Sequence, residues 1–471
     1  MPEFGTSGLR GLASDLTDEL CATYAAAFVS SHGHNGRLFL GRDWRDSSPR
    51  IARAVAAGAA SQGVEVVDCG VLPTPALAYA ALAEGTLSIT VTGSHIPADR
   101  NGLKFYTGQG EFTKADEAPL KSAVARWTAP ITGDVDAVQF DATAGYVARY
   151  VDGLPSGILE GQRIGVWLHS SAASEALPAI LTGLGADVMP LGASDSFVPV
   201  DTEAIGPETR TKLKAWVKEH ALDALVSTDG DADRPLLIDD TGEVVPGDIL
   251  GPVAARWLRA DTVVTTVSAN TMVDLMAAFP SVTRTKIGSP HVIAAMEERM
   301  IAGAERVVGY EPNGGFLLGW DVANHDFESG GAFRKKETRL PKLMTRDSAL
   351  PLLAAFAAMA EAGGTLSELV ARLPERRTAT DRLQDIPRAA SLSLVDAICG
   401  GDRSVLPAEF GALEAMDGTD GVRMTFVSGR ILHIRPSGNA PELRCYVEAE
   451  SKSAADTLLK KALQSLREAV T

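Results

Sequence analysis

One pattern recurs three times in this chain and limits what it can fold into. An apolar run leads into a polar, turn-rich loop and out into a second apolar run. The copies are SITV-TGSHIPADRNG-LKFY from residue 88, ALVS-TDGDADR-PLLID from residue 224 and RVVGY-EPNGG-FLLG from residue 306. No sequence identity joins the three copies, so the repeat lies in the pattern alone. We therefore expect three related α/β domains that each contribute one loop to a shared site.

Strand and helix signals alternate over the first 370 or so residues. Short runs rich in apolar and β-branched side chains predict strands at residues 37–41, 64–68, 88–93, 163–168, 224–227, 262–267, 284–288 and 306–311. Residues 47–63 predict a helix between two of these strands. This alternation indicates α/β units with largely parallel sheets.

The last hundred residues show a different pattern. Residues 423–451 contain a pair of β runs around a Gly/Pro/Asn turn, and an amphipathic helix is predicted from Ala454. These signals predict a smaller α+β domain. A length of 471 residues suggests about three domains and allows four. We place the four at residues 1–140, 141–245, 246–370 and 371–471.

Net charge and cysteine usage limit the partners and the compartment. The net charge of −16 disfavours polyanions, so we expect no nucleic-acid partner, although a local basic cleft can still bind a small anion. The four cysteines lie far apart without a C-x-x-C pair, as in reduced, cytoplasmic proteins without a thiolate metal site. We read no signal peptide, and no apolar stretch approaches the ~20 residues that span a bilayer.

The strongest local signal is the acidic loop after residue 228. Asp229, Asp231 and Asp233 stand at alternate positions, and three carboxylates can converge on one hard cation if the loop curls. An EF-hand also uses positions 1, 3 and 5, and Asp240 falls at position 12, but Arg234 occupies position 6 and strands flank the loop. A haloacid-type phosphatase motif fails at Asp233. A solvated acidic turn stays open as the alternative.

The second signal is TGSH at residues 92–95, followed by NGLK at residues 101–104. Ser94 lies on a loop at a strand end, where a serine is exposed enough to act as a nucleophile or carry phosphate. Serine and glycine also mark ordinary turns, so the motif alone is weak. The neighbouring His95 favours a supporting hydrogen-bonding role over base catalysis.

Three further loops carry polar groups suited to phosphate or sugar. Arg435-Pro-Ser437-Gly438-Asn439 combines a guanidinium, a hydroxyl, an amide and backbone N–H groups, which suits a phosphate. Glu311-Pro-Asn313 offers a carboxylate and an amide to neighbouring sugar hydroxyls. Plain turns remain the alternatives for both. FGTSGLRG places Arg10 on a glycine-rich turn, and the chain lacks a Walker A loop and a G-x-G-x-x-G fingerprint.

Together, and in this order, the five loops resemble the α-D-phosphohexomutase superfamily. GRDWRDSS at residues 41–48 and VLPTPALAYA at residues 71–80 are similar to that family too, and the resemblance covers essentially the whole chain. It implies four domains around a central cleft. Three of them are α/β domains, and the last is related to a nucleotide-cyclase-like or TATA-box-like α+β fold.

The resemblance also implies roles for individual residues. Ser94 would carry the transferred phosphate, and Asp229, Asp231 and Asp233 would bind one Mg²⁺ together with it. Arg10, Lys104 and Arg234 would stabilise charge and move protons, with His95 among the catalytic residues. The implied substrate-binding set is Arg234, Lys286, Glu311, Asn313, Gly314, Arg435, Ser437, Gly438 and Asn439.

Three positions depart from the family pattern. Ile96 stands where Asn is usual after Ser-His, which leaves the hydrogen bonding of the serine loop open. Ser289 stands where some bacterial phosphomannomutases carry a histidine after Lys-x-Gly, and His291 lies two residues on. The general base therefore stays open. Asn313 replaces the more usual Ser of the sugar loop, as in acetylglucosamine-phosphate mutases.

The implied activity is that of a phosphomannomutase, with phosphoglucomutase activity beside it. Such an enzyme interconverts hexose 1-phosphate and hexose 6-phosphate through a phosphoserine and a hexose 1,6-bisphosphate, which also serves as activator. Phosphoglucosamine or acetylglucosamine-phosphate mutase is the alternative, although phosphoglucosamine mutases usually show Asp and Ile where this chain has Ser7 and Leu9. A non-catalytic sugar-phosphate-binding protein is a third possibility. The sequence leaves the preferred epimer and the oligomeric state open.

Overall fold

The N-terminal sheet buries both of its faces. The computed structural model describes residues 2–5, 8–127, 135–323, 339–437 and 441–470. The sheet order is β1-β2-β6-β5-β3-β4-β8, with β7 paired to β6. Its strands are β1 (Glu3–Gly5), β2 (Gly8–Leu12), β3 (Arg37–Arg42), β4 (Glu65–Val71), β5 (Leu87–Val91), β6 (Arg100–Thr107), β7 (Gly110–Glu111) and β8 (Val138–Gln139). Leu38 and Leu40 face one apolar cluster and Phe39 faces the other, because side chains alternate along a strand.

Helices cover both faces of this sheet. The helices are α1 (Asp18–Ser31), α2 (Ser48–Ala60), α3 (Thr74–Ala83) and α4 (Lys114–Ala125). Residues of α1, α2 and α4 share the cluster of Leu38 and Leu40, whereas α3 packs with Phe39. The helix predicted at residues 47–63 is α2, which carries a proline in its first turn, where the missing N–H costs nothing.

The second and third sheets hold five strands each. The second has the order β10-β9-β11-β12-β13. Its elements are α5 (Ala142–Gly153), β9 (Arg163–His169), α6 (Ala176–Gly183), β10 (Asp187–Ala193), α7 (Pro207–Glu219), β11 (Ala224–Thr228), β12 (Pro235–Ile238) and β13 (Val244–Val245). The third has the order β15-β14-β16-β17-β20. Its elements are α8 (Gly247–Trp257), β14 (Thr262–Thr266), α9 (Met272–Leu275), β15 (Ser281–Thr285), α10 (Ser289–Ile301), β16 (Val307–Tyr310), β17 (Phe316–Leu318), β20 (Leu343–Asp347), α11 (Ala349–Ala362) and α12 (Leu366–Ala371). A separate pair joins β18 (Val322–Ala323) to β19 (Arg339–Leu340).

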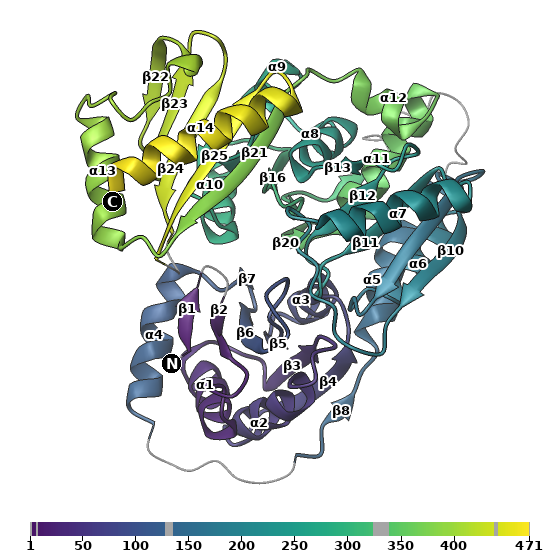
Figure 1. Ribbon diagram of the computed structural model, residues 1–471. Coiled ribbons are helices and arrows are strands. Elements are labelled where there is room, and N and C mark those ends of the chain that lie inside the picture. The colour runs from purple at the N-terminus through teal and green to yellow at the C-terminus, as the bar shows by residue number, and fades with distance from the viewer. Residues whose placement is uncertain (1, 6–7, 128–134, 324–338, 438–440, 471) are drawn as a thin grey trace.

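One strand order repeats in all three sheets. The segments β4-β3-β5-β6, β10-β9-β11-β12 and β15-β14-β16-β17 each place the first strand of the unit in the middle and the second on one side. The third strand lies on the other side, followed by the fourth. The first strand pairs parallel with the second and the third, and the third pairs antiparallel with the fourth. The repeat predicted from the loops is therefore a repeat of whole α/β units (Figure 1).

The antiparallel step corrects one expectation. The sheets are mixed rather than largely parallel, because each of the three polar loops is a hairpin that turns the chain straight back beside the preceding strand. The strand predicted at residues 284–288 ends at Thr285, so Lys286 lies in the loop that follows it. The other predicted strands occur within a few residues of the expected positions.

The C-terminal domain is an antiparallel sheet covered by two helices. The order β21-β25-β24-β23-β22 joins β21 (Arg377–Gln384), β22 (Leu413–Asp417), β23 (Val422–Phe426), β24 (Ile431–Pro436) and β25 (Glu442–Ala449). The helices are α13 (Arg388–Cys399) and α14 (Lys452–Val470). The first of the two predicted β runs is two strands, because a tight turn at Gly429, with φ of +77°, separates β23 from β24.

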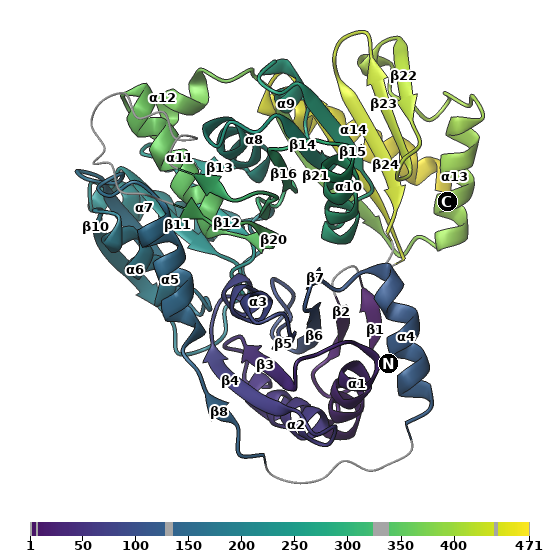
Figure 2. The same ribbon diagram turned by 180° about the vertical axis from the view of Figure 1, so that it is seen from behind.

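The apolar cores set the C-terminal domain apart. One continuous buried cluster includes Phe39, Ile164 and Val263, and so joins the first three domains. The C-terminal sheet packs with α13 and α14 in a cluster of its own. Figure 2 shows this domain beside α10 and above the N-terminal body. None of the four cysteines, all of them in the described part of the chain, forms a disulfide. The described helices include none that combines the length and apolarity needed to cross a membrane.

Candidate active site

The acidic loop lies at the buried end of β11. Asp229, Asp231 and Asp233 are at most 1% exposed, and one carboxylate oxygen from each lies within 4.8 Å of the others. Burial, and then the charges of the other two aspartates, raise the pKa of Asp229 well above its usual value. Asp231 Oδ1 and Asp233 Oδ1 are buried and have no hydrogen-bond partner among the described residues. Such oxygens are costly unless a cation satisfies them, so this donor set fits a hard divalent metal.

The serine loop meets the acidic loop directly. Ser94 Oγ donates a hydrogen bond to Asp229 Oδ2 at 2.5 Å, although the residues are 135 positions apart. Ser94 adopts a φ of +54°, which is unusual for a residue with a side chain and typical of strained functional positions. A Cβ at Gly230 would lie 2.8 Å from the carbonyl oxygen of Ser94, so only glycine lets the loops approach this closely. The two strongest sequence signals therefore form one site.

Arg45 shapes the serine loop where the family asparagine is absent. Its buried guanidinium donates to the carbonyl oxygens of Ser94, Ile96, Pro97 and Arg100 at 2.7–3.0 Å. Four charge-assisted bonds fix the loop backbone without any contribution from the side chain at Ile96. Arg45 belongs to the GRDWRDSS segment, which resembled the family but suggested no role for this residue.

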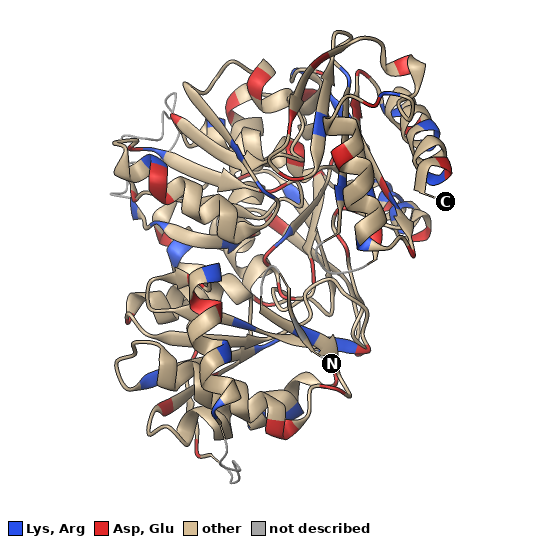
Figure 3. Ribbon diagram, turned by 90° about the vertical axis from the view of Figure 1, so that its left-hand side faces the viewer, with Lys and Arg blue, Asp and Glu red and all other residues tan. Residues whose placement is uncertain are grey.

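Lys104 lies between two of the carboxylates. Its Nζ is 2.5 Å from Asp231 Oδ2 and 2.6 Å from Asp233 Oδ2. Burial alone would raise the pKa of Asp233, but Arg346, Lys104 and Arg234 together hold it well below its usual value. Asp233 is therefore a carboxylate at any ordinary pH. In Figure 3, basic and acidic segments lie side by side where the N-terminal body meets the other domains.

Arg234, Arg10 and His95 complete the charged surroundings of Ser94. Burial, and then Arg234 and Arg346, lower the pKa of Arg10 to about 10, so Arg10 is still a cation at neutral pH. His95 Nδ1 lies 3.3 Å from Ser94 Oγ. Arg234, burial and Arg10 lower the pKa of His95 to about 2. A neutral imidazole of such low basicity can exchange a hydrogen bond but is a poor proton acceptor.

The loop predicted to read the sugar contributes to the same site from the third sheet. Glu311 is 3% exposed, and its Oε2 lies 3.4 Å from Nη1 of Arg346. Asn313 Oδ1 accepts a hydrogen bond from the N–H of Gly315, and the N–H of Gly314 donates to the carbonyl of Glu311 at 2.8 Å. The side-chain amide therefore stabilises the turn that presents Glu311.

The loop after β15 does not offer Ser289 as a base. Ser289 is fully buried, and its hydroxyl donates to Glu111 Oε2 at 2.7 Å in the N-terminal domain. Lys286 is exposed on the same loop. Burial, and then Lys286, lower the pKa of His291. Ser289 thus joins the third domain to the N-terminal domain.

The C-terminal loop contributes a guanidinium near the end of β24. Arg435 Nη1 pairs with Asp420 Oδ2 at 2.6 Å, and its buried Nε has no hydrogen-bond partner among the described residues. Asp420 Oδ2 also accepts the N–H of Ile287, which places this loop beside Lys286. Ser437 is buried, and its N–H donates to the carbonyl of Glu442 at 2.8 Å. The predicted phosphate ligands Gly438 and Asn439 lie outside the described residues.

Two contacts to the aspartate carboxylates escaped the sequence analysis. Thr74 Oγ1 donates to Asp231 Oδ2 at 2.7 Å, and Arg346 Nη2 lies 2.8 Å from Asp233 Oδ2. Thr74 stands in VLPTPALAYA, a segment noted for its resemblance to the family. Arg346 follows β-rich residues near the start of a helix, where nothing in the local sequence marks it.

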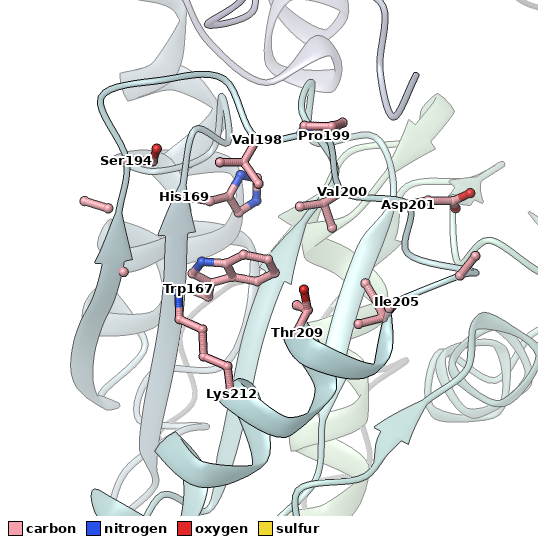
Figure 4. A pocket seen from close by; sticks show the side chains of 14 residues that line it. Trp167, His169, Ser194, Val198, Pro199, Val200, Asp201, Ile205, Thr209 and Lys212 are labelled. Carbon is pink, nitrogen blue, oxygen red and sulfur yellow. The ribbon is translucent and has the colours of Figure 1, made fainter. Parts of the chain in front are cut away.

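A cavity of about 380 Å³ lies apart from this cluster (Figure 4). Trp167 and His169 at the end of β9 and Lys212 of α7 line it, and none of the predicted site residues does. His169 Nε2 lies 3.0 Å from the carbonyl oxygen of Thr228, next to the acidic loop. The cluster of buried charged side chains around Asp229, Asp231 and Asp233 therefore identifies the candidate site, and cavity size does not.

Comparison with known proteins gives the same picture along the whole chain. The chain matches four domain models of the phosphoglucomutase/phosphomannomutase family: α/β/α domain I at residues 1–129, domain II at residues 148–242, domain III at residues 246–377 and the C-terminal domain at residues 370–464. A phosphomannomutase of Sinorhizobium fredii is 45% identical over 99% of this chain and 98% of its own length. One from Salmonella muenchen is 40% identical over 98% of this chain and 95% of its own.

More distant relatives include a phosphoglucosamine mutase of Nocardioides sp., 34% identical over 96% of this chain and 95% of its own. Among solved structures, a phosphoglucomutase/phosphomannomutase family protein of Burkholderia thailandensis aligns with a TM-score of 0.76 at 21% identity, covering 98% of this chain and 97% of that one. An N-acetylphosphoglucosamine mutase of Aspergillus fumigatus, in complex with GlcNAc-6P and magnesium, aligns with a TM-score of 0.58 at 15% identity, covering 100% and 96%. With four matching domains and two relatives at 40% identity or more, this chain belongs to the phosphoglucomutase/phosphomannomutase family.

Proposed function

We propose that this protein is a phosphomannomutase that also interconverts glucose 1-phosphate and glucose 6-phosphate. The observation that carries the proposal is the direct contact of Ser94 Oγ with a buried cluster of three aspartates. A serine in that position is surrounded by the charges that phosphoryl transfer needs. The two relatives named as phosphomannomutases, both at 40% identity or more, support the choice of substrate.

The aspartates would hold one Mg²⁺ together with a phosphoryl group on Ser94. Hard cations select oxygen ligands, and a phosphoryl dianion next to three carboxylates would be repelled without one. When bound, the ion neutralises this charge and polarises the phosphoryl group for in-line transfer. The Aspergillus fumigatus mutase was solved with magnesium, which supports the same metal here.

The residues of the chain then have distinct tasks in the transfer. The sugar hydroxyl attacks the phosphorus and gives up its proton, the bond from phosphorus to Ser94 Oγ breaks, Ser94 Oγ takes up a proton, and a hexose 1,6-bisphosphate forms. Lys104 and Arg234 face the developing charge and keep Asp233 ionised. His95 exchanges a hydrogen bond with Ser94 Oγ, and Arg10 adds a cation beside them.

The bisphosphate must then turn over before Ser94 recovers the other phosphoryl group. Arg435, with Ser437, Gly438 and Asn439, would hold whichever phosphate is not reacting, and Lys286 lies on the adjacent loop. Glu311, Asn313 and Gly314 would read the sugar hydroxyls in both orientations. Added hexose 1,6-bisphosphate would activate the enzyme by phosphorylating Ser94. An A. fumigatus mutase solved with glucose 1,6-bisphosphate supports a ligand of this kind.

Phosphoglucosamine mutase is the rival activity, since relatives with that name reach 34% identity. The higher identity to phosphomannomutases favours mannose and glucose phosphates. A non-catalytic binding protein is disfavoured because Ser94 Oγ contacts Asp229 of the aspartate cluster directly. We further propose that the protein acts in the cytoplasm on small hexose phosphates, without a nucleic-acid or membrane partner.

The test is a parallel mutase assay with mannose, glucose and glucosamine 1-phosphates, with Mg²⁺ and a trace of glucose 1,6-bisphosphate. Mannose and glucose 1-phosphates should turn over at comparable rates, and glucosamine 1-phosphate should be much slower. A clear preference for glucosamine 1-phosphate would replace the proposed activity with its rival. The absence of turnover on all three would contradict an enzymatic role.

A further inference from the structure

One buried arginine outside the recognised loops touches two of them at once. Arg346 lies in β20 and is 4% exposed. Its Nη2 lies 2.8 Å from Asp233 Oδ2 in the acidic loop, and its Nη1 lies 3.4 Å from Glu311 Oε2 in the sugar loop. The two tips of one rigid guanidinium thus face carboxylates that come from different domains.

The backbone around Arg346 is fixed by all three α/β domains. Its N–H donates to Glu111 Oε1 at 3.2 Å in the N-terminal domain. The preceding Thr345 donates its hydroxyl to the same oxygen at 2.7 Å. Two residues on, Ser348 Oγ donates to the carbonyl oxygen of Ala232, inside the acidic loop, at 2.7 Å. These contacts fix the position of Arg346 relative to all three domains.

The cations around Asp233 are divided between its two carboxylate oxygens. Lys104 and Arg346 both approach Oδ2, whereas the buried Oδ1 lies 3.7 Å from Nε of Arg234 and has no hydrogen-bond partner among the described residues. Burial alone would lower the pKa of Arg346, but Asp233, Glu111 and Glu311 raise it well above its usual value, so the guanidinium stays charged. The arrangement sets the rotation of the Asp233 carboxylate about its own axis.

We propose that Arg346 is a positioning residue that orients Asp233 and Glu311 relative to each other and so couples the acidic loop to the sugar loop. This inference rests on the proposed function, because it assigns Glu311 to the sugar and Asp233 to the phosphoryl end. A lysine cannot replace the residue fully, since its single ammonium lacks the two-pronged geometry that reaches both carboxylates. A misplacement of about 1 Å between sugar and phosphoryl group costs about 10²-fold in rate.

The experiment measures how Arg346 and Glu311 depend on each other. Arg346→Met, Glu311→Gln and the double variant are assayed for kcat and KM with glucose 1-phosphate. Each single variant should lose about ten- to a hundredfold in kcat/KM, as expected for one charge-assisted contact. The double variant should lose clearly less than the product of the two single losses, because both single variants remove the contact between Arg346 and Glu311. Losses that multiply would show that the two residues act separately and would overturn the proposal.

Two further measurements keep folding and activity apart. Arg346→Lys preserves the charge and should recover part of the loss, while Arg284→Met, a matched arginine of the same domain that pairs with Asp274, should leave the kinetics unchanged. On a Ser94→Ala background, binding of glucose 1-phosphate is measured by calorimetry, which needs no turnover. Arg346→Met should weaken this binding about tenfold, to the level of Glu311→Gln. Unchanged binding would refute the role of Arg346, even if the wild-type enzyme turns over its substrates as proposed. Absence of wild-type turnover would contradict the proposed function but not the role of Arg346 in binding.

Discussion

The aspartate cluster, which we propose as the catalytic centre, and the loop of the C-terminal domain that we propose binds phosphate are built in opposite ways. The centre lies where three domains share one continuous core, and its aspartates are at most 1% exposed. Arg435 lies near the end of β24, in a domain with a separate core, and pairs with Asp420. The aspartates thus lie among domains that share a core, whereas the proposed phosphate ligand belongs to a domain that packs separately. We expect this combination to suit a ligand that must leave in one orientation and return in another.

Electrostatics sharpens the contrast. In the centre, three buried carboxylates face Lys104, Arg234 and Arg346, so a change in any one charge alters the rest. A phosphoryl group carries a charge of about −1.5 to −2, which one divalent cation offsets, so the balance survives when both arrive together. A substitution at Arg435 instead removes a local contact, the ion pair with Asp420. Substitutions in the centre should therefore lower kcat, and substitutions at the C-terminal end should raise KM.

Removal of the Ser94 hydroxyl should have the largest effect. Ser94→Ala removes the group that would accept the phosphoryl group, and we expect turnover to fall by about 10³-fold or more. Ser88→Ala in β5 is a matched control, because that buried hydroxyl has no hydrogen-bond partner among the described residues. Intact-mass spectra after exposure to glucose 1,6-bisphosphate should show one phosphoryl group on the Ser94 peptide of wild type. Turnover above a few per cent in Ser94→Ala would refute the phosphoserine.

Removal of the metal should come next. Excess chelator should abolish turnover, Mg²⁺ should restore it, and Asp231→Asn should lower kcat by about 10²-fold or more, because the site loses a charged ligand. Asp240→Asn is the control. Asp240 accepts hydrogen bonds from the backbone and hydroxyl of Ser367 at 2.8 and 2.9 Å, which argues against a place in an EF-hand. A metal requirement shifted by Asp240→Asn and untouched by Asp231→Asn would reverse the assignment.

The sugar loop should discriminate at carbon 4 and not at carbon 2. Glucose and mannose share equatorial hydroxyls at carbons 3 and 4, so both 1-phosphates should react. Galactose has an axial 4-hydroxyl, which leaves a buried hydrogen-bonding group of the loop unpaired, and its 1-phosphate should be about 10²-fold worse. Glu311→Ala should reduce this preference in coupled assays of the three 1-phosphates. Comparable turnover of galactose 1-phosphate by wild type would mean that Glu311 and Asn313 do not read the 4-hydroxyl.

Arg435→Ala should raise KM for every substrate by a similar factor, about ten- to a hundredfold, while kcat changes less. The reason is that the phosphate is common to all substrates and lies far from the reacting atoms. Arg430→Ala, which breaks the Glu450 pair at the other end of the same strand region, serves as the control. A loss confined to one sugar would move this loop from phosphate binding to sugar recognition.

The sequence predicted the residues that a loop motif marks and missed those that no motif marks. Three polar loops, an aspartate cluster and a serine loop that faces it were predicted, and the contact of Ser94 with Asp229 confirms that two of these loops meet. Arg346 could not be predicted, because it lies within β20, where no local pattern marks it. The domain boundaries at 140, 245 and 370, and the catalytic role of each site residue, stay predictions.

The smallest effect concerns the stability of the C-terminal domain in acid. His433 is 1% exposed in β24, and its Nε2 lies 2.6 Å from the carbonyl oxygen of Asp420. Burial lowers its pKa to about 4, against about 6.5 in the unfolded chain. As the pH falls below 6.5, His433 is therefore protonated in the unfolded chain but stays neutral in the folded domain. The free energy of unfolding falls progressively down to about pH 4. Between pH 7.5 and pH 5 this amounts to about 1–2 kcal/mol.

The urea midpoint of this domain, followed by pulsed hydrogen exchange at β23–β25, should fall accordingly. His433→Gln keeps a donor for the Asp420 carbonyl and should reduce the fall, whereas the exposed His34→Gln in the N-terminal domain should not. An acid response that is equal in wild type and His433→Gln would show that this histidine does not make the C-terminal domain the acid-sensitive part of the molecule.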